Sequence, residues 1–306
     1  MDEFDLIRRY FDRDGEMPGV AVGVGDDGAV LTPDTAKQQI QVIDTLVEGV
    51  HFPPDTKAAD IAYRAVAVNL SDIAAMGAYP RWMTLALTLS DSSEQWVAAF
   101  SSGLFDAADK YKVALVGGDT TSGPIVTVTV TITGEVETGA ALLRSGAKVG
   151  DAIFVTGTLG DAAAGLDLLQ RGEPDEFLAQ RFLRPAPRIT TGRALVGKAN
   201  SAIDISDGLA GDLKKLLTAS GVGGEIDIDK LPLSESLRER FTPDEQQQLA
   251  LCGGDDYELC FTAAREAVKD IPGIAAIGAV RESTGLICRR NGEIVEVDDS
   301  GYRHFQ

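Results

Sequence analysis

Hydrophobic residues recur along the chain with two different periods, and these periods predict its strands and helices. The clearest strand is IVTVTVTITGEV at 125–136, where Val and Thr alternate. A longer period of three to four residues, rich in Ala, is typical of a helix packed on a core. By these two patterns, further strands are expected over 39–46, 82–89 and 111–119, and helices are expected over 58–77 and 93–110.

The second half of the chain repeats this mixture after a turn-rich stretch from Thr138 to Gly150. DAIFVTGTLGDAAAGL predicts a strand, a glycine turn and a helix, and SAIDISDGLAGDL predicts a strand that turns into a helix at Ser206 or Asp207. Shorter strands are expected in YELCFTA, IAAIGAV and GLICRR. We therefore expect an α+β (mixed α/β) protein of two domains, 1–140 and 141–306.

Composition and charge exclude several classes of protein. Hydrophobic residues make up 44% and charged residues 25%, which is typical of a globular chain, and the formal net charge is −19. This acidity argues against a nucleic-acid or anionic-membrane partner. The sequence has no run that could span a membrane and no basic, apolar leader, so we expect a cytoplasmic protein. The cysteines Cys252, Cys260 and Cys288 are far apart, which indicates reduced core thiols.

Two glycine motifs resemble nucleotide-binding loops but lack the required context. GVGDDG at 23–28 matches G-x-G-x-x-G, yet the residues after it predict a strand and a turn instead of a helix. GRALVGKA at 192–199 is one residue short of a P-loop, and Ala199 replaces the hydroxyl that would hold Mg²⁺. We interpret the first as a loop between strands and the second as a packing helix.

Aspartates recur beside glycines at the ends of apolar segments, where a carboxylate is costly unless it is solvated, hydrogen-bonded or bound to a cation. They are Asp26, Asp27, Asp44, Asp72, Asp119, Asp204, Asp207, Asp255 and Asp256. Oxygen ligands point to Mg²⁺ or Ca²⁺, and a chain with two histidines is a poor candidate for a multi-histidine zinc site.

Structural explanations remain open for several of these aspartates. Asp207 or Ser206 could cap a helix, and Asp26 could bond its own loop backbone. Asp72, inside a predicted helix, and Asp44, on the apolar face of a predicted strand, are harder to explain structurally. Mg²⁺ held by few carboxylates usually serves substrate phosphates, and neighbouring glycines let backbone N–H groups approach them. We therefore favour a multi-metal site for phosphoryl transfer.

Eight ordered motifs together resemble the thiamine-monophosphate kinase family, within the superfamily of aminoimidazole-ribonucleotide and selenophosphate synthetases. They are GVGDDGAVL, VIDTLVEGVHF, AVNLSDIAAMGAYP, LVGGDTTSGP, LLRSGAKVGDAIFVTGTLGDAAAGL, RFLRPAPRI, AIDISDGLAGDL and GGDDYELCFT. The resemblance implies ATP-dependent phosphorylation of thiamine monophosphate to thiamine diphosphate, assisted by several Mg²⁺ ions. It also implies a homodimer, in which the sheet of an N-terminal α/β domain pairs with that of a second subunit.

The resemblance also assigns roles to individual residues. It implies metal ligands at Asp27, Asp44, Asp72, Asp119, Asp204 and Asp207, with Asp72 bridging several ions. It places ATP against Gly118, Asp119, Arg144 and Ser206. For Tyr111, two roles stay open: it borders the nucleotide, or it packs in the core. It places thiamine monophosphate against His51, Asp255 and Tyr302. No side-chain nucleophile or general base is implied, because the attacking phosphate oxygen is already anionic.

Two positions depart from the family pattern. Val42 and Ile43 stand where the family often has hydroxyl side chains, so metal contact there must use backbone carbonyls or water. Asp255 stands where the family often has Glu, so its substrate contact should be longer or water-mediated. Two rival functions remain: an aminoimidazole-ribonucleotide synthetase-like enzyme, and a non-catalytic Mg²⁺- or nucleotide-binding dimer. A selenophosphate synthetase is disfavoured because the first cysteine is Cys252.

Overall fold

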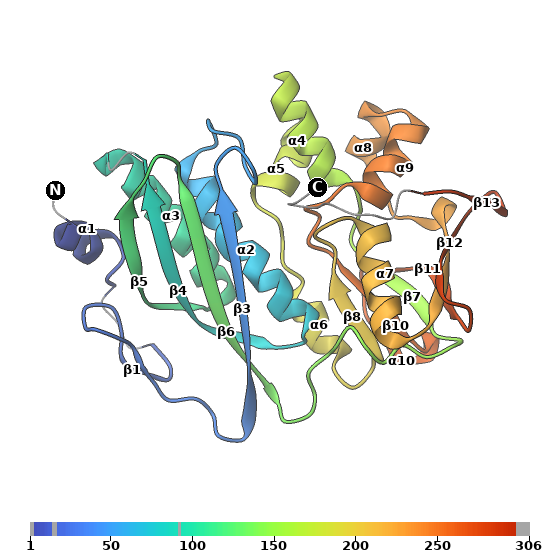
Figure 1. The fold of residues 1–306 in the computed structure, drawn as a ribbon, viewed down its shortest axis with the longest axis horizontal. Helices are drawn as coiled ribbons and strands as arrows, with labels where there is room; N and C mark the ends of the chain where they lie inside the picture. The colour runs from blue at the N-terminus through green and yellow to red at the C-terminus, as the bar shows by residue number, and fades with distance from the viewer. Residues whose placement is uncertain (1–2, 14–16, 91–92, 298–306) are drawn as a thin grey trace. The chain divides into compact units, whose positions relative to one another are not determined.

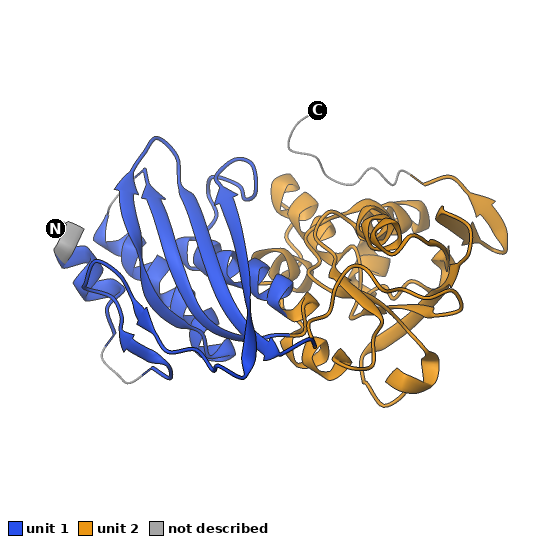
Figure 2. Ribbon diagram, turned by 60° about the horizontal axis from the view of Figure 1, so that its bottom comes forward, with its two compact units in different colours: residues 1–73, 78–139 blue, residues 74–77, 140–306 orange. Residues whose placement is uncertain are grey.

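The protein forms two compact units, which Figure 2 colours separately. The first unit comprises residues 1–73 and 78–139, and the second comprises 74–77 and 140–306. The division after Gly139 falls inside the turn-rich stretch noted above. The structure is a computed structural model that describes residues 3–13, 17–90 and 93–297.

The first unit is built on a four-stranded sheet of order β3-β6-β4-β5 (Figure 1). Strand β6 pairs antiparallel with β3 and β4, whereas β4 and β5 are parallel. The predicted strands are confirmed, and β6 alternates as expected, with Val128, Val130 and Ile132 fully buried. The strands are β1 (Val20–Val22), β2 (Val30–Leu31), β3 (Lys37–Val47), β4 (Tyr79–Leu89), β5 (Ala114–Ser122) and β6 (Thr127–Glu137).

Two long helices cover one face of this sheet, α2 (Ala58–Ala75) and α3 (Glu94–Tyr111) (Figure 1). Both are predicted correctly. Helix α3 starts where the Ser93 side chain accepts the backbone N–H of Trp96. A Cβ at Gly103 would lie 1.9 Å from the carbonyl oxygen of Ala59, so this glycine lets the two helices touch. A short helix, α1 (Glu3–Tyr10), precedes the β1–β2 hairpin.

The second unit contains a seven-stranded sheet of order β13-β12-β9-β11-β7-β10-β8. Its pairs are antiparallel apart from β9 and β12. Its strands are β7 (Ala152–Thr156), β8 (Ser201–Asp204), β9 (Gly223–Asp227), β10 (Leu259–Ala263), β11 (Ile274–Arg281), β12 (Gly285–Arg290) and β13 (Glu293–Val295). Its helices are α4 (Asp161–Arg171), α5 (Glu176–Leu183), α6 (Ile189–Leu195), α7 (Leu209–Ser220), η1 (Ile228–Lys230), α8 (Glu235–Arg240), α9 (Pro243–Cys252) and α10 (Arg265–Val268).

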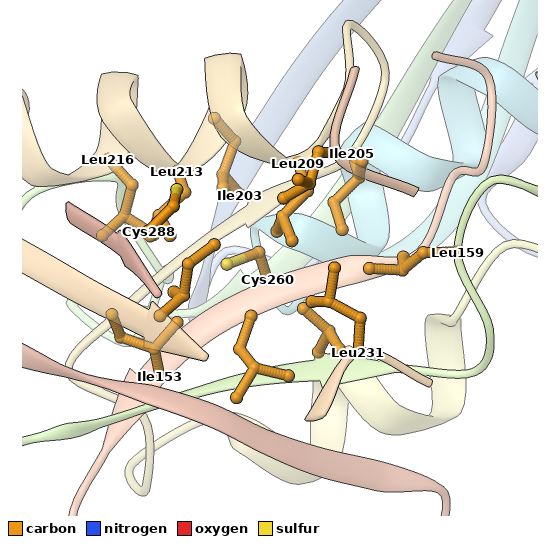
Figure 3. Close-up of a cluster of buried hydrophobic side chains, with 14 of the residues drawn as sticks. Ile153, Leu159, Ile203, Ile205, Leu209, Leu213, Leu216, Leu231, Cys260 and Cys288 are labelled. Carbon is orange, nitrogen blue, oxygen red and sulfur yellow. The ribbon is translucent and has the colours of Figure 1, made fainter. Parts of the chain in front are cut away.

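Apolar side chains fill both faces of this sheet, which explains the short, continuously apolar strands. Ile153 and Cys260 belong to the cluster beneath α7 (Figure 3), whereas their neighbours Phe154 and Phe261 belong to the cluster on the other face. The rings of Phe154 and Phe261 stack with centroids 5.1 Å apart. The three cysteines are free thiols, and Cys252 is half-buried. The second unit therefore has a complete core, and the α+β prediction is confirmed.

The start of helix α7 was predicted wrongly. The helix begins at Leu209, and Gly208, with φ of 104°, is its N-cap without a side-chain hydrogen bond. Ser206 and Asp207 therefore belong to the loop between β8 and α7. The interpretation of the first glycine motif is confirmed, because GVGDDG leads into β2. That of the second is confirmed in part, because GRALVGKA begins in α6 but the helix ends at Leu195 and a turn follows. Within the described residues, no helix is both long enough and apolar enough to cross a membrane.

Candidate active site

A cleft of about 410 Å³ lies in the first unit, between the glycine loop at 23–28 and strand β5. Its lining includes Asp27, Gly118 and Asp119, three residues predicted to meet Mg²⁺ or ATP. Both aspartates are exposed to solvent. The fold therefore brings two segments that are distant in the sequence to a single cleft with carboxylates on its wall.

Backbone packing explains the residue types in this cleft. A Cβ at Gly118 would lie 2.0 Å from the carbonyl oxygen of Leu85, its partner on β4, whereas a Cβ at Gly117 would meet open space. The carboxylate of Asp26 accepts the backbone N–H of Asp27 at 2.8 Å, as the sequence suggested. The turn thus engages Asp26, which agrees with assigning the metal role to Asp27.

Strand β3 and helix α2 carry the next two predicted ligands. Asp44 is half-buried on the same face of β3 as Ile40 and Val42, so the conflict predicted for this strand is present. Ile43 points to the opposite face and is 64% exposed. Asp72 is half-buried near the end of α2. The side chain of Ile43 therefore faces away from Asp44, which leaves its backbone as the group available for any metal contact.

His51 lies in a tight turn directly after β3. The imidazole Nδ1 of His51 accepts the backbone N–H of Val47 at 3.0 Å. The backbone N–H of His51 donates to the carbonyl oxygen of Val47 at 2.9 Å. A neutral imidazole that accepts at Nδ1 carries its proton on Nε2. The turn therefore fixes the ring so that Nε2 is a hydrogen-bond donor, which suits a phosphate or another acceptor.

In the second unit, Asp204 ends strand β8 and is buried, and Ser206 and Asp207 follow it. The N–H groups of Ser206 and Asp207 both donate to Oδ2 of Asp212, at 2.9 Å each. Asp212 comes from the first turn of α7, and sequence reasoning missed it. Ser206 is expected to contact ATP, and because its backbone N–H is already bonded to Asp212, its hydroxyl is the group left for that contact.

Lys215 completes this loop from the next turn of α7. Its ammonium group lies 2.5 Å from Asp207 and 2.8 Å from Asp212. Burial raises the pKa of the Asp212 carboxyl, and the hydrogen bond from Lys215 opposes that rise. Sequence reasoning also missed Lys215, although its spacing of three residues from Asp212 places both on one helix face.

The turn at 253–258 lies directly beside the loop after β8. The N–H of Asp255 donates to the carbonyl oxygen of Ser206, and the N–H of Tyr257 donates to that of Ile205, at 2.9 Å each. Asp255 and Tyr257 have φ of 70° and 51°, in the left-handed region. The predicted substrate contact Asp255 and the predicted ATP contact Ser206 are therefore neighbours.

Three other predicted residues have different surroundings. Arg144 is exposed, and its carbonyl oxygen accepts the hydroxyl of Ser220 at 3.1 Å. Tyr111 ends helix α3 beside Lys110 and does not line the cleft of the first unit. Burial raises the pKa of Tyr111 to about 12, with the neighbouring Tyr63 adding to the rise. Tyr302 lies outside the described residues.

The predicted metal ligands are shared between the two units. Those in the first are Asp27, Asp44, Asp72 and Asp119, and those in the second are Asp204 and Asp207. Within the part of the chain that the structure describes, no three His, Cys, Asp or Glu side chains gather closely enough to hold a metal ion. Carboxylate donors such as Asp27 and Asp119 fit Mg²⁺ by their chemistry. The multi-metal site stays a prediction.

Comparison with known proteins agrees with the two units. The family model for the N-terminal domain of AIR synthase related proteins matches residues 25–136, and the model for the C-terminal domain matches 148–289. The thiamine-monophosphate kinase of Escherichia coli (strain K12) is 48% identical, over 99% of this chain and 98% of that protein. The chain belongs to the thiamine-monophosphate kinase family. As a member of this family, it is an enzyme, a kinase, as the sequence predicts.

Solved structures of thiamine-monophosphate kinases share the fold. A crystal structure from Stenotrophomonas maltophilia K279a superposes with a TM-score of 0.85 at 44% identity, covering 95% of this chain and 96% of that one. AaThiL complexed with AMPPCP and TMP superposes with a TM-score of 0.82 at 35% identity, covering 99% and 96%. The two-domain architecture of this chain is therefore that of the thiamine-monophosphate kinase family.

Proposed function

We propose that this chain transfers the γ-phosphoryl group of ATP to the phosphate of thiamine monophosphate, which yields thiamine diphosphate and ADP. The observation that carries the proposal is the 48% identity to a thiamine-monophosphate kinase over 99% of the chain. The likeness to AaThiL in complex with AMPPCP, an ATP analogue, and TMP supports the same pair of substrates.

The reaction requires positioning and charge neutralisation more than acid–base chemistry. An oxygen of the acceptor phosphate forms a bond to the γ-phosphorus, and the bond from that phosphorus to the oxygen of ADP breaks in line. The attacking oxygen is anionic, so no side chain has to remove a proton. This agrees with the cleft of the first unit, whose polar lining includes the carboxylates Asp26, Asp27 and Asp119 beside glycines.

Mg²⁺ is the cofactor that fits these donors. When bound, it neutralises phosphate charge and favours the in-line geometry. The proposed ligands in the first unit are Asp27, Asp44, Asp72 and Asp119, and those in the second unit are Asp204 and Asp207. Asp207 has first to exchange its ion pair with Lys215, which lies 2.5 Å away. We therefore expect Asp207 to be the weakest ligand of the set.

Several polar and aromatic residues that the sequence singled out have side chains that suit the two substrates. Arg144 can bind a phosphate through two parallel N–H groups, and Ser206 can donate its hydroxyl to ATP. His51, with its proton on Nε2, and Asp255 would contact thiamine monophosphate. Tyr302 would stack on the cationic thiamine rings. Tyr111 does not line the cleft of the first unit, so any contact of Tyr111 with the nucleotide would lie outside that cleft.

The open face of the first unit's sheet supports a homodimer. On β3, β6 and β4, the middle of this face carries uncharged side chains: Gln41, Ile43, Thr45, Thr127, Thr129, Thr131, Thr133, Thr84, Ala86 and Thr88. Charged residues, Lys37, Glu135 and Glu137, lie on the same face toward one end of β3 and β6. Helices α2 and α3 lie on the opposite face (Figure 1). An uncharged area of sheet surface, in a chain with a net charge of −19, is well suited to pack against a second copy.

One assay separates this function from the rival ones. The purified protein is incubated with ATP, Mg²⁺ and a panel of phosphorylated metabolites, and the products are identified by mass spectrometry. We expect thiamine diphosphate and ADP in equal amounts, with thiamine monophosphate as the acceptor. Free phosphate released with ADP would indicate a synthetase-type reaction. Binding of ATP with no ADP formed would indicate a non-catalytic protein.

A further inference from the structure

Three motifs meet inside the second unit at a residue to which the proposed reaction gives no role. They are TGTLGD at 156–161, RFLRPAPRI at 181–189 and GGDDYEL at 253–259. The residue that joins them is Glu258, which is fully buried. A buried carboxylate of this kind is strongly destabilising unless it is paired and hydrogen-bonded. Its partners therefore show what the motifs do together.

Glu258 is held from three sides. Arg188 binds both of its oxygens, with Nε 2.6 Å from Oε2 and Nη2 2.5 Å from Oε1. Nη2 of Arg181 lies 2.8 Å from Oε1, and the hydroxyl of Thr156 donates to Oε2 at 2.5 Å. Two-point binding by a planar guanidinium fixes the orientation of a carboxylate as well as its charge. The side chain of Glu258 is thus immobilised.

The backbone around this cluster is shaped to admit it. Gly157 has φ of 56°, and a Cβ there would lie 2.2 Å from Oε1 of Glu258 and 2.6 Å from Nη2 of Arg188. Any side chain at Gly157 would displace the carboxylate or the guanidinium. Gly157, the first glycine of TGTLGD, is therefore required both by the turn and by the space that the ion cluster occupies.

The backbone of the same glutamate belongs to the candidate active site. The carbonyl oxygen of Glu258 accepts the N–H of Ile205 at 2.8 Å. Two further bonds, from Tyr257 to Ile205 and from Asp255 to Ser206, continue this ladder. Asp255 and Tyr257 hold left-handed backbone conformations, which persist only where their surroundings impose them. The fixed carboxylate of Glu258 anchors the end of this strained turn.

We propose that Arg188 is a positioning residue of the enzyme. By fixing Glu258, it holds the turn at 253–258 against the loop after β8, and so it sets the positions of Asp255 and Ser206. The inference rests on the proposed function, which assigns Asp255 to thiamine monophosphate and Ser206 to ATP. Arg188 contacts both oxygens of Glu258, whereas Arg181 contacts one of them and also lies 3.5 Å from Asp161.

The test is Arg188→Lys, which keeps the positive charge and removes the two-point contact. Arg193→Lys, at an exposed position on the same helix segment, is the matched control. Kinetics are measured well below both melting temperatures. We expect kcat/KM for thiamine monophosphate to fall roughly ten- to hundredfold in Arg188→Lys and to stay at the parental value in the control. A lower melting temperature with parental kcat and KM would overturn the proposal, because it shows a purely structural role.

A second measurement does not depend on the reaction. Hydrogen exchange is followed at the amides of Ile205, Asp255 and Tyr257, which form the ladder, and at Phe261 in the core as reference. We expect faster exchange at the three ladder amides in Arg188→Lys, with Phe261 unchanged. Unchanged exchange at the ladder would overturn the link between Arg188 and the turn. If the parent itself fails to phosphorylate thiamine monophosphate, the proposed function is wrong, and the exchange result still decides the link.

If Arg188→Lys does not fold, Glu258→Gln replaces it in both measurements. This variant keeps the shape of the side chain and removes the charge that the arginines bind. We expect the same faster exchange and the same loss of kcat/KM. Parental values of both would contradict the proposal.

Discussion

Two adjacent glycines on strand β5 offer a test of how the cleft in the first unit is built. Gly118 and Gly117 both line it, yet their surroundings differ. A Cβ on Gly118 would lie 2.0 Å from the carbonyl oxygen of Leu85, and a Cβ on Gly117 would meet no atom within 4 Å. Replacing each glycine with alanine therefore adds the same methyl group to two neighbouring positions with opposite steric outcomes.

The size of the effect follows from these distances. A carbon and an oxygen that are not bonded rarely approach closer than about 3 Å, so Gly118→Ala has to move β5 away from β4 by roughly 1 Å. Overpacking of this kind costs about 1–3 kcal/mol, and each backbone hydrogen bond that is lost adds about 1 kcal/mol. Gly117→Ala introduces no overlap and reduces the freedom of the unfolded chain, so its stability should be unchanged or higher by up to about 1 kcal/mol.

Urea unfolding and ATP binding are measured for the parent and both variants. We expect Gly118→Ala to be less stable by about 2–4 kcal/mol and to bind ATP more weakly, because Asp119 moves with the strand. Gly117→Ala should unfold like the parent. If Gly118→Ala matches Gly117→Ala in both stability and ATP affinity, the tight approach of β4 and β5 does not shape this cleft, and our reasoning is refuted.

Three further changes test the residues around the site. Arg144→Ala should weaken ATP binding by ~1.5–3 kcal/mol, as expected for a charge-assisted contact, and calorimetry that finds the parental affinity would show Arg144 to be a surface residue. Asp72→Asn should have a metal-free melting temperature at or above that of the parent and should lose most of its turnover. Its stabilisation by Mg²⁺ should be less than the ~2.7 kcal/mol that a metal at one hundred times its Kd gives a single site. A lower metal-free melting temperature with retained activity would contradict a ligand role. Thr131→Asp places a charge on the open sheet face and should convert a dimer to a monomer in light scattering, whereas an unchanged mass would exclude this face as the interface.

Local patterns were sufficient to predict most elements of this fold. Strand β6 buries one face against the core, so its Val and Thr alternation survives in the sequence. Helix α2 is buried on nearly all sides, and its alanine-rich sequence was sufficient to predict it. The start of α7 was missed because the usual capping residues, Ser206 and Asp207, are present but not used. Gly208 turns the chain, and Asp212 reaches back to bond their N–H groups.

The candidate site was predictable only where glycines and aspartates lie together in the sequence. Asp27 and Asp119 were found in this way, and the fold brings their segments to one cleft. The cluster around Glu258 could not be found, because its arginines lie 70 and 77 residues away along the chain. Such a pairing depends on how distant segments pack together, and the periodicity of hydrophobic residues within one segment does not show which distant segment it meets.

The central claim, direct transfer of the γ-phosphoryl group to thiamine monophosphate, can be tested by following that group. The purified protein is supplied with Mg²⁺, thiamine monophosphate and ATP that carries heavy oxygen at all three γ-phosphate non-bridging positions. Mass spectrometry then locates the label. The account predicts that all three heavy oxygens appear in thiamine diphosphate and none in free phosphate. Label released as inorganic phosphate in step with ADP would contradict it.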